Sequence, residues 1–396
     1  MKRITKCTAV LLALLMTLAF TSCKDRKDPD PAPDVPSISD YEVEHEPEFG
    51  GVYIKITIDD FNKLGFTYGD SVDVEFSNGY KLEDIPYYNG YYVDAGEPLL
   101  IAYPGYPYIK AAVNYGEDLW DEAELKASRE NNLWVKANLE EHSKAAVKLR
   151  EKGKYADIQA ARDIQYSDER SKYTTDEEFA NFRNMTVGNL KEGVVYRSAS
   201  PCDNQHNRAP YTDRLIKEAG VNFILNLADN EKKIEGYITK EGFDSPYFLE
   251  LYQNGKVNPI AMSMNYTAED FKTKLANGFI SIAEHEGPYL IHCTEGKDRT
   301  GFVCMLLEAL AGASYEEIVD DYMVTYDNYY KITKEKDPAK YDVILDKNLN
   351  AMLKEVIGDK SADLTKADLA AAAKAYLLKA GMTEEQISAL LERVAG

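Results

Sequence analysis

Hydrophobic and polar residues alternate along the chain from about Tyr41 to Tyr115. The runs VYIKITI (52–58) and SVDVEF (71–76) carry an apolar residue at nearly every second position, and turn-forming Gly, Asn and Asp residues lie between such runs. Because the side chains of a strand point alternately to its two faces, this pattern predicts half-buried β-strands. We therefore expect residues 41–118 to form a β-rich module.

The spacing of charges changes between residues 119 and 165. Opposite charges recur four residues apart in this stretch, and apolar residues follow a helical period. Such pairs are typical of a solvent-exposed helix face. The pattern predicts a helical connector over residues 119–165.

Near residue 290 the pattern predicts a strand, a tight loop and a helix in direct succession. Residues 289–292 (YLIH) form a short apolar run after Gly-Pro, and apolar residues at helical spacing extend from Thr300 to Leu310 and stop before Gly312. A loop between a strand and a helix directs backbone N–H groups and the positive end of the helix dipole toward an anion. The sequence therefore predicts an anion site at the loop.

The first residues of the chain have the pattern of a signal peptide. Three basic residues precede an apolar run at about 9–20, which is too short to span a bilayer and ends in small residues before Cys23. Residues 1–22 resemble a bacterial lipoprotein signal peptide, which implies lipidation of Cys23; the alternative is cleavage by the ordinary signal peptidase beside an incidental cysteine. Residues 23–40 are rich in Pro and Asp and are expected to form a solvated tether. We expect an exported protein that is lipid-anchored in the bacterial envelope, in the periplasm, on the outer membrane or at the cell surface.

The charge balance excludes some functions. Lys and Arg number 46 against 67 Asp and Glu, so the net charge is 46 − 67 = −21, and removal of residues 1–22 makes it 43 − 67 = −24. Sequence-independent nucleic-acid binding needs a basic face, so nucleic acid is not an expected partner. The five cysteines form no CxxC pair and the five histidines show no ligand spacing, so we expect neither a metal nor another cofactor.

A cysteine and an arginine frame the predicted anion loop. Cys293 lies where a helix N-terminus stabilises a thiolate, and Arg299, six residues later, has a planar fork that can bind two phosphoryl oxygens. Thr300 places a hydroxyl beside the sulfur, and His292 is expected to order the loop by hydrogen bonding rather than to act as a base. The expected reaction is attack of the thiolate on phosphorus to form a cysteinyl-phosphate. The residues expected to bind the phosphoryl group are Thr294, Glu295, Gly296 and Lys297.

The segment HCTEGKDRTG (292–301) resembles the signature loop of the cysteine-dependent protein tyrosine phosphatases, and its GKDRTG ending is most similar to bacterial tyrosine and lipid phosphatases. Two upstream segments, 179–201 and 219–231, are similar to other motifs of that family. Where the family has Asp-Leu-Arg, this chain has Asn-Leu-Ala at 226–228, so no role is carried over to those positions. The resemblance covers about residues 166–330. It implies that residues 166–396 form an α/β phosphatase domain with a central, mostly parallel sheet flanked by helices and with additional C-terminal helices.

The resemblance leaves the general acid open among three aspartates. In similar bacterial lipid phosphatases and in myotubularin-like enzymes, an aspartate at the position of Asp298 is a proposed acid, and a protonated carboxyl beside the leaving oxygen suits ester cleavage. Asp298 is therefore the first candidate, Asp229 the second and Asp270 the third. The alternative role for Asp298 is a salt bridge that orders the loop.

Other polar residues near the loop have open roles. Lys297 is similar to a lysine of phosphatases that act on phosphoinositides and would add a second cation at the pocket rim; the alternative is a solvated lysine. Arg197 and Arg208 either support the site or lie on the surface. Cys202 could form a protective disulfide with Cys293, whereas Cys304 is expected in the core.

The tyrosine-rich stretches 65–76 and 85–120 resemble the C-terminal β-barrel domain of SAM hydroxide adenosyltransferases, which implies that residues 41–118 form a small β-barrel module. A barrel of this kind is expected to be a spacer or a partner-docking module, since a fold does not imply a function.

The sequence thus predicts phosphoester hydrolysis through a cysteinyl-phosphate. The expected substrates are phosphotyrosine proteins or phosphoinositide and inositol phosphate compounds, including a dual-specificity activity, and the expected second partner is a membrane reached through the N-terminal lipid. The alternative is a catalytically weak phosphate-binding or adhesion lipoprotein that acts through its barrel.

Overall fold

The computed structural model describes residues 35–47, 50–94, 96–125, 127–130, 133–136, 143–263 and 265–396. The predicted signal peptide, Cys23 and most of the predicted tether lie outside these residues. Within the described ranges, no helix is long and apolar enough to cross a membrane.

The N-terminal domain is a closed barrel with the strand order β1-β2-β6-β5-β4-β3-β9. Its neighbouring strands pair antiparallel, except for β4 and β5, which are parallel. Apolar side chains at alternate positions fill the interior, as Val72, Val74 and Phe76 do on β3. Closure leaves no exposed strand edge. The strands are β1 (Ser37–His45), β2 (Val52–Ile54), β3 (Ser71–Phe76), β4 (Lys81–Tyr88), β5 (Pro98–Ile101), β6 (Ile109–Val113) and β9 (Lys144–Glu151).

The prediction of a helical connector over 119–165 was wrong for most of its length. Strand β9 pairs with both β1 and β3 and closes the barrel, and its alternate residues Ala145 and Val147 are buried in the barrel core. Lys144 and Lys148, four residues apart on this strand, also fit a helical period, which explains the error. Among the described residues of this range, the helices are α2 (Leu119–Glu122) and α3 (Ala156–Arg162), and β7 (Ala127–Glu130) pairs with β8 (Leu133–Lys136). At the other end, β1 begins inside the predicted tether, at Ser37.

The second domain contains a five-stranded sheet in the order β10-β11-β14-β12-β13. Four of its strands are parallel and the edge strand β10 is antiparallel, so the predicted α/β fold with a mostly parallel sheet is confirmed. The strands are β10 (Arg183–Asn184), β11 (Val195–Ser198), β12 (Phe223–Asn226), β13 (Val257–Pro259) and β14 (Tyr289–His292).

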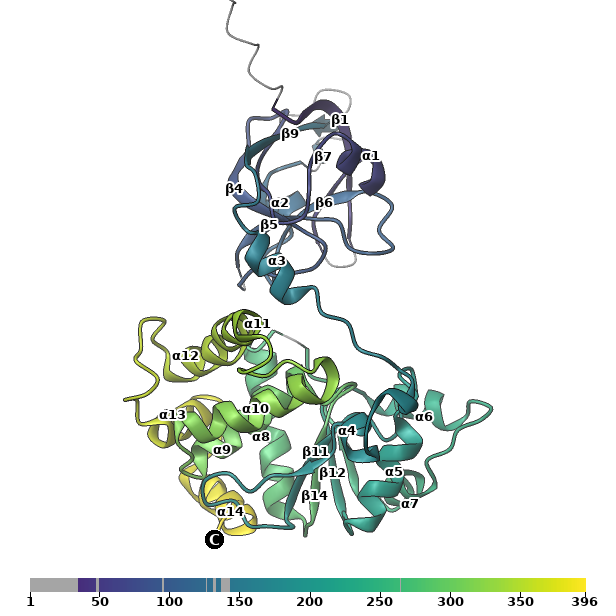
Figure 1. Ribbon diagram of the computed structural model, residues 1–396, viewed down its shortest axis with the longest axis vertical. Helices are drawn as coiled ribbons and strands as arrows, with labels where there is room; N and C mark the ends of the chain where they lie inside the picture. The colour runs from purple at the N-terminus through teal and green to yellow at the C-terminus, as the bar shows by residue number, and fades with distance from the viewer. Residues whose placement is uncertain are drawn as a thin grey trace, which may run out of the picture.

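Helices cover both faces of this sheet (Figure 1). On β14, Leu290 packs with α5, α6 and α7, whereas Tyr289 and Ile291 pack with α8, α9, α10, α13 and α14 on the opposite face. A strand buried on both faces needs a continuous apolar run, which explains the sequence of β14. The helices are α4 (Asp176–Ala180), α5 (Ala209–Glu218), α6 (Glu231–Ile238), α7 (Pro246–Gln253), α8 (Glu269–Glu284), α9 (Asp298–Leu310), α10 (Tyr315–Tyr330), α11 (Pro338–Ile344), α12 (Ala351–Ile357), α13 (Leu369–Lys379) and α14 (Glu384–Val394).

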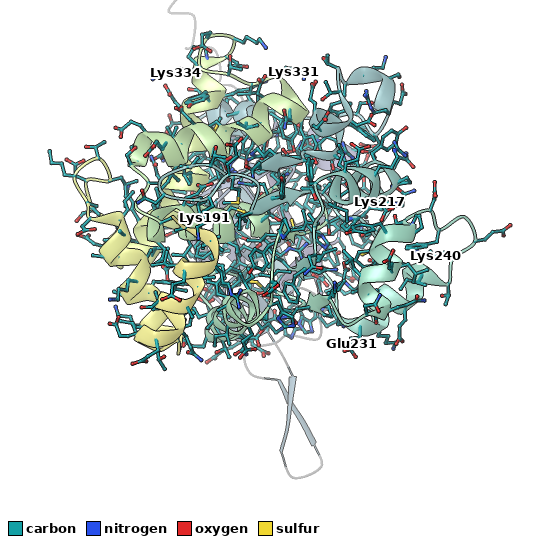
Figure 2. All side chains as sticks on the ribbon, turned by 90° about the horizontal axis from the view of Figure 1, so that it is seen from below. Lys191, Lys217, Glu231, Lys240, Lys331 and Lys334 are labelled. Carbon is teal, nitrogen blue, oxygen red and sulfur yellow. The ribbon has the colours of Figure 1, made fainter. Side chains whose placement is uncertain are left out.

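Charged side chains lie at the periphery of this domain. Figure 2 labels six charged side chains of this domain, and all six are exposed. The labelled residues are Lys191, Lys217, Glu231, Lys240, Lys331 and Lys334. Some charged side chains lie inside the domain instead, among them Arg197 and Asp321.

Candidate active site

The loop that follows β14 lies between a buried strand and the N-terminus of α9. Cys293 is the first loop residue and its side chain is buried, and α9 begins at Asp298. The predicted succession of strand, loop and helix is therefore confirmed. The loop also lies at the carboxyl ends of the parallel strands, where α/β domains bind ligands.

Gly296 allows the loop to turn against the end of β11. Its φ angle is +67°, and a Cβ atom there would lie 2.2 Å from the carbonyl oxygen of Ser198. Residues with side chains avoid both this backbone region and such a distance. The glycine of the loop is thus required by backbone geometry.

Three consecutive loop carbonyls are tied to the surrounding scaffold. The Thr294 carbonyl accepts a hydrogen bond from the Ser200 N–H at 3.0 Å, and the Glu295 carbonyl accepts one from the Tyr329 hydroxyl at 2.7 Å. The Gly296 carbonyl accepts from two side chains, the Asn181 amide at 3.1 Å and the Arg197 guanidinium at 3.2 Å. These bonds fix the loop backbone before any substrate binds, which is the preorganisation that anion stabilisation requires.

A buried charge network holds those side chains in turn. Arg197 donates to Asp321 at 2.9 Å, and Arg183 donates to the same carboxylate at 2.8 Å. Although burial raises the pKa of Asp321, the two guanidinium groups lower it below its usual range, so the carboxylate is charged. Burial and the neighbouring Asp321 raise the pKa of Glu308 well above its usual value, which favours the neutral form of this side chain.

The two arginines with open roles differ in position. Arg197 is one of the side chains that hold the loop. Arg208 is also buried, and its hydrogen bonds among the described residues go to groups outside the loop; its guanidinium lies 4.8 Å from the ring centroids of Tyr166 and Tyr329 and pairs with Asp168 at 2.8 Å. Arg208 thus lies against the ring of Tyr329, whose hydroxyl binds the loop.

The Arg299 guanidinium reaches back over the loop. One of its terminal nitrogens donates to the Thr294 hydroxyl and the other to the Met262 carbonyl, each at 3.3 Å. Thr300 follows in the first turn of α9, fully buried, and its hydroxyl oxygen has no hydrogen-bond partner in the described residues. The fork of Arg299 thus faces the loop that begins with Cys293.

His292 lies entirely in the interior beneath the loop. Its Nδ1 atom is 3.1 Å from the Cys293 carbonyl oxygen. Burial lowers the pKa of His292 to about 4, so the ring is neutral at physiological pH. A neutral ring that donates to the loop backbone matches the loop-ordering role expected from the sequence.

Lys297 turns toward acids of its own loop. Its ammonium lies 3.0 Å from Glu295 and 3.7 Å from Asp298, and it donates to the Tyr330 hydroxyl at 3.1 Å. Burial lowers the pKa of Lys297, but the two carboxylates outweigh this effect and raise it well above its usual value. The lysine is charged, yet it is already paired and is not a solvated side chain.

The three candidate acids occupy different surroundings. Asp298 is half exposed and lines the same cavity as Arg299. Asp229 is buried after β12, where its carboxylate accepts from Asn226 at 3.1 Å. Asp270 is exposed on α8 and paired with Lys274 at 3.0 Å. The structure therefore brings only Asp298 to a cavity shared with the arginine.

No site residue was predicted in the barrel, but the barrel forms part of the cavity that Asp298 and Arg299 line. The cavity is about 190 Å³ in volume and lies between the two domains. Its barrel lining includes Tyr91 and Tyr115, two of the nine tyrosines between residues 80 and 115. That density of tyrosine was the available signal, although nothing in the sequence placed these rings beside Arg299.

The described cysteines are all free thiols, so the suggested Cys202–Cys293 disulfide is not formed. Cys202 instead lies 3.5 Å from the Ser200 hydroxyl. Cys304 is buried in the core on α9. No group of three or more metal-ligating side chains that could hold an ion occurs among the described residues.

Comparison with known proteins agrees with this geometry. A model of the tyrosine phosphatase family matches residues 177–395, more than half of the chain and the whole α/β domain except its first turns. The chain belongs to the tyrosine phosphatase family. Because the matched region contains β11 to β14, the loop and α9, residues 177–395 are called the phosphatase domain below.

Two curated relatives match over a short region. A tyrosine-protein phosphatase of Cupriavidus necator is 44% identical over 46 residues, which is 12% of this chain and 17% of that protein. A tyrosine-protein phosphatase of Nostoc commune is 49% identical over 43 residues, which is 11% of this chain and 15% of that protein. The chain thus spans less than a fifth of the length of these relatives.

One solved structure that resembles the chain is the core catalytic domain of a PP-IP phosphatase from S. cerevisiae. Its sequence is 23% identical, the TM-score is 0.25, and the match covers 37% of this chain and 81% of that one.

Proposed function

We propose that this protein hydrolyses phosphate monoesters through a cysteinyl-phosphate intermediate. The observation that carries the proposal is the loop itself, in which three consecutive carbonyls are tied down between Cys293 and the fork of Arg299. Membership of the tyrosine phosphatase family supports the same reaction class.

In the first step the Cys293 thiolate attacks phosphorus and the bond from phosphorus to the leaving oxygen breaks. Arg299 and the loop amides, those of Thr294, Glu295, Gly296 and Lys297, bind the phosphoryl oxygens and stabilise the charge that develops on them. Asp298, as the carboxylic acid, donates a proton to the leaving oxygen. The products are a free alcohol or phenol and a phosphorylated cysteine.

In the second step water attacks the phosphorylated cysteine and the sulfur–phosphorus bond breaks. Asp298, now a carboxylate, accepts the proton of that water. The buried Thr300 hydroxyl is a ready donor to the departing sulfur, because it has no other partner in the described residues. Inorganic phosphate leaves and the thiolate is restored.

The proposed substrates are phosphotyrosine proteins, with inositol phosphates and phosphoinositides as the second class. The pairing of Lys297 with Glu295 and Tyr330 supports this order, since an ammonium already neutralised adds little affinity for a polyanion.

Hydrolysis of p-nitrophenyl phosphate by the full chain tests the reaction. We expect the wild type to be active and Cys293→Ser to lose at least about 10³-fold in kcat, since the nucleophile is removed. Cys304→Ala is the matched control, because Cys304 is also a buried free thiol but lies on α9, beyond the loop that begins with Cys293. Equal rates for wild type and Cys293→Ser would contradict the proposal and favour a phosphate-binding role.

The acid is tested separately with Asp298→Asn. The loss in kcat should be small for p-nitrophenyl phosphate, whose leaving group needs no proton, and about 10²-fold or more for phenyl phosphate. Equal losses with both substrates would move the role to Asp229 or Asp270.

We also propose that the protein is exported and anchored to the bacterial envelope through lipidated Cys23. The sequence of residues 1–23 supports this proposal. Labelling of cells with radioactive palmitate should mark the wild type and not Cys23→Ala; label on both proteins would contradict it.

A further inference from the structure

The cavity beside Arg299 has two walls that come from different domains. The phosphatase domain supplies an aromatic cluster in which Tyr266 stacks on Phe302, with ring centroids 5.5 Å apart, and Phe271 meets Phe302 edge-on at 5.1 Å. The barrel supplies the opposite wall, which includes Tyr115. Arg299 and Asp298 line the same cavity, so the leaving group of an ester that is held by Arg299 and protonated by Asp298 would lie between these walls.

Tyr115 projects from a turn that follows β6. Its backbone has a φ angle of +49°, a region that large side chains rarely adopt, and its side chain is partly exposed. Burial together with the negative charge of Asp298 raises the pKa of Tyr115 to about 12, so the phenol is neutral and close to that carboxylate. An aromatic ring that is held in a strained turn and left partly exposed is a common feature of binding sites.

The turn that carries Tyr115 is fixed to the neighbouring barrel loop. The side chain of Asn114 donates to the Val93 carbonyl at 2.7 Å, and the Asn114 backbone N–H donates to the Glu97 carbonyl at 3.0 Å. Since Val93 lines the cavity as well, the barrel wall consists of two loops joined by one asparagine. This wall is therefore built before a substrate enters.

Contacts across the domain boundary hold the two walls in register. Helix α3, at the end of the barrel, packs against α11 of the second domain, as Figure 1 shows. Arg162 donates to the side chain of Asn348 in the π-helical turn η2 (Leu345–Asn350), and Asn348 donates to the Tyr326 hydroxyl at 2.6 Å. Lys347, in the same turn, lies 4.0 Å from Asp94 of the barrel. Arg162 and Asn348 line the cavity too, so its geometry depends on the domain contact.

We propose that Tyr115 contacts the leaving group of the substrate, so that the barrel is a specificity element of the phosphatase site for phosphorylated aromatic groups. The proposal rests on the proposed function. The volume of about 190 Å³ is several times that of a water molecule, about 30 Å³, and the rings on both walls offer stacking and edge contacts to a phenyl group.

The charges of the cavity favour an aromatic group over an inositol polyphosphate. Lys347 faces both Asp94 and Asp346, the latter at 3.7 Å, so this ammonium is already paired. Arg162 is held by the neutral side chain of Asn348. Two carboxylates, Asp94 and Asp298, line the same cavity and oppose a polyanion, whereas the rings of Tyr115 and Tyr266 are partly exposed to a ligand.

The test compares Tyr115→Asn with Tyr103→Asn in the full chain. Asparagine tolerates the positive φ of residue 115, so this substitution removes the ring without adding backbone strain. Tyr103 is a matched control, because it is a barrel tyrosine of nearly equal exposure, 46% against 47%, that does not line this cavity. The measurements are kcat and KM with a phosphotyrosine peptide, and the inhibition constant of inorganic phosphate.

For Tyr115→Asn we expect KM to rise roughly three- to tenfold while kcat is nearly unchanged, as loss of one ring contact implies. The inhibition constant of phosphate should stay within about twofold, since phosphate binds only the loop; this also shows that the variant is folded. Tyr103→Asn should match the wild type.

Two results would overturn the inference while leaving the proposed function intact. One is an unchanged KM in Tyr115→Asn, with an active wild type and an inactive Cys293→Ser. The other is an equal rise in KM with inositol hexakisphosphate, which carries no aromatic ring. An inactive wild type would instead contradict the proposed function itself.

Discussion

The loop that carries Arg299 and the barrel wall of the cavity beside it are built in opposite ways. The loop is one continuous segment, 292–301, which gives the cavity Asp298 and Arg299, and its backbone is fixed by buried polar groups such as Asn181 and Arg197. The barrel wall comes from two loops that are far from the phosphatase motif in sequence, and it presents a partly exposed tyrosine. The difference teaches that the groups proposed for chemistry are held rigidly by a polar network, whereas those proposed for selectivity are aromatic and accessible. Substitutions in the loop should therefore affect rate and stability, and those in the barrel wall should affect KM.

The largest expected effect is on the loop side, from Arg299→Lys. Lysine keeps the charge but cannot bind two phosphoryl oxygens with one planar fork, so we expect kcat for p-nitrophenyl phosphate to fall about 10³-fold. Thermal stability should change little, because the guanidinium makes only two hydrogen bonds, both at 3.3 Å. A rate within about tenfold of the wild type would contradict the proposal that the loop determines the rate and the barrel wall determines KM.

The next effect concerns the network behind the loop. Asp321→Asn leaves the buried Arg197 and the partly buried Arg183 without their counter-charge, and we expect it to lower the free energy of unfolding by about 3–5 kcal/mol. Glu308→Gln is the matched control, because burial and Asp321 favour the neutral form of Glu308, which an amide resembles in shape and charge. Urea unfolding of both variants measures the difference; equal losses would show that the charge of Asp321 is not what holds the loop.

A pH effect follows from His292. Its pKa in the folded protein, about 4, lies below the ordinary value of 6.5, so between these values the unfolded chain binds a proton that the folded chain does not. The free energy of unfolding should therefore fall as the pH drops from about 6.5 to 4, by up to about 3 kcal/mol from this group. Unfolding curves of the wild type and His292→Gln across that range should diverge at low pH. Parallel curves would show that His292 is not buried in its neutral form.

The smallest expected effect comes from glycine substitutions. They distinguish the cost of a steric clash from the cost of a positive φ angle. Gly296→Ala and Gly220→Ala both place alanine at a positive φ, +67° and +66°, but only at residue 296 does the new Cβ meet another atom, at 2.2 Å. We expect Gly220→Ala to cost about 1 kcal/mol and Gly296→Ala about 2 kcal/mol or more, with loss of activity only in the latter. Thermal unfolding and hydrolysis assays of both variants provide the comparison.

The sequence was sufficient to predict what depends on short segments. The strand, loop and helix around Cys293 follow local periodicity, and the mostly parallel sheet follows from the family resemblance. The sequence of residues 144–151 fits both a helical period and the two-residue period of a strand. Only the pairing of these residues with β1 and β3 decides that they form a strand.

The residues that were missed are joined by tertiary contacts. Tyr115 and Arg299 are 184 positions apart, and no local pattern indicates that they share a cavity. The pairing of Lys297 with Tyr330 was hidden for the same reason, since α10 folds back beside the loop.

The most direct test of the central claim is the mass of the loop peptide after rapid acid quenching of the wild type during turnover of p-nitrophenyl phosphate. The account predicts that the peptide containing Cys293 gains the mass of one phosphoryl group, and that the gain is absent in Cys293→Ser and present in Tyr115→Asn. Steady turnover with no phosphoryl group on Cys293, or with one on another residue, would contradict it.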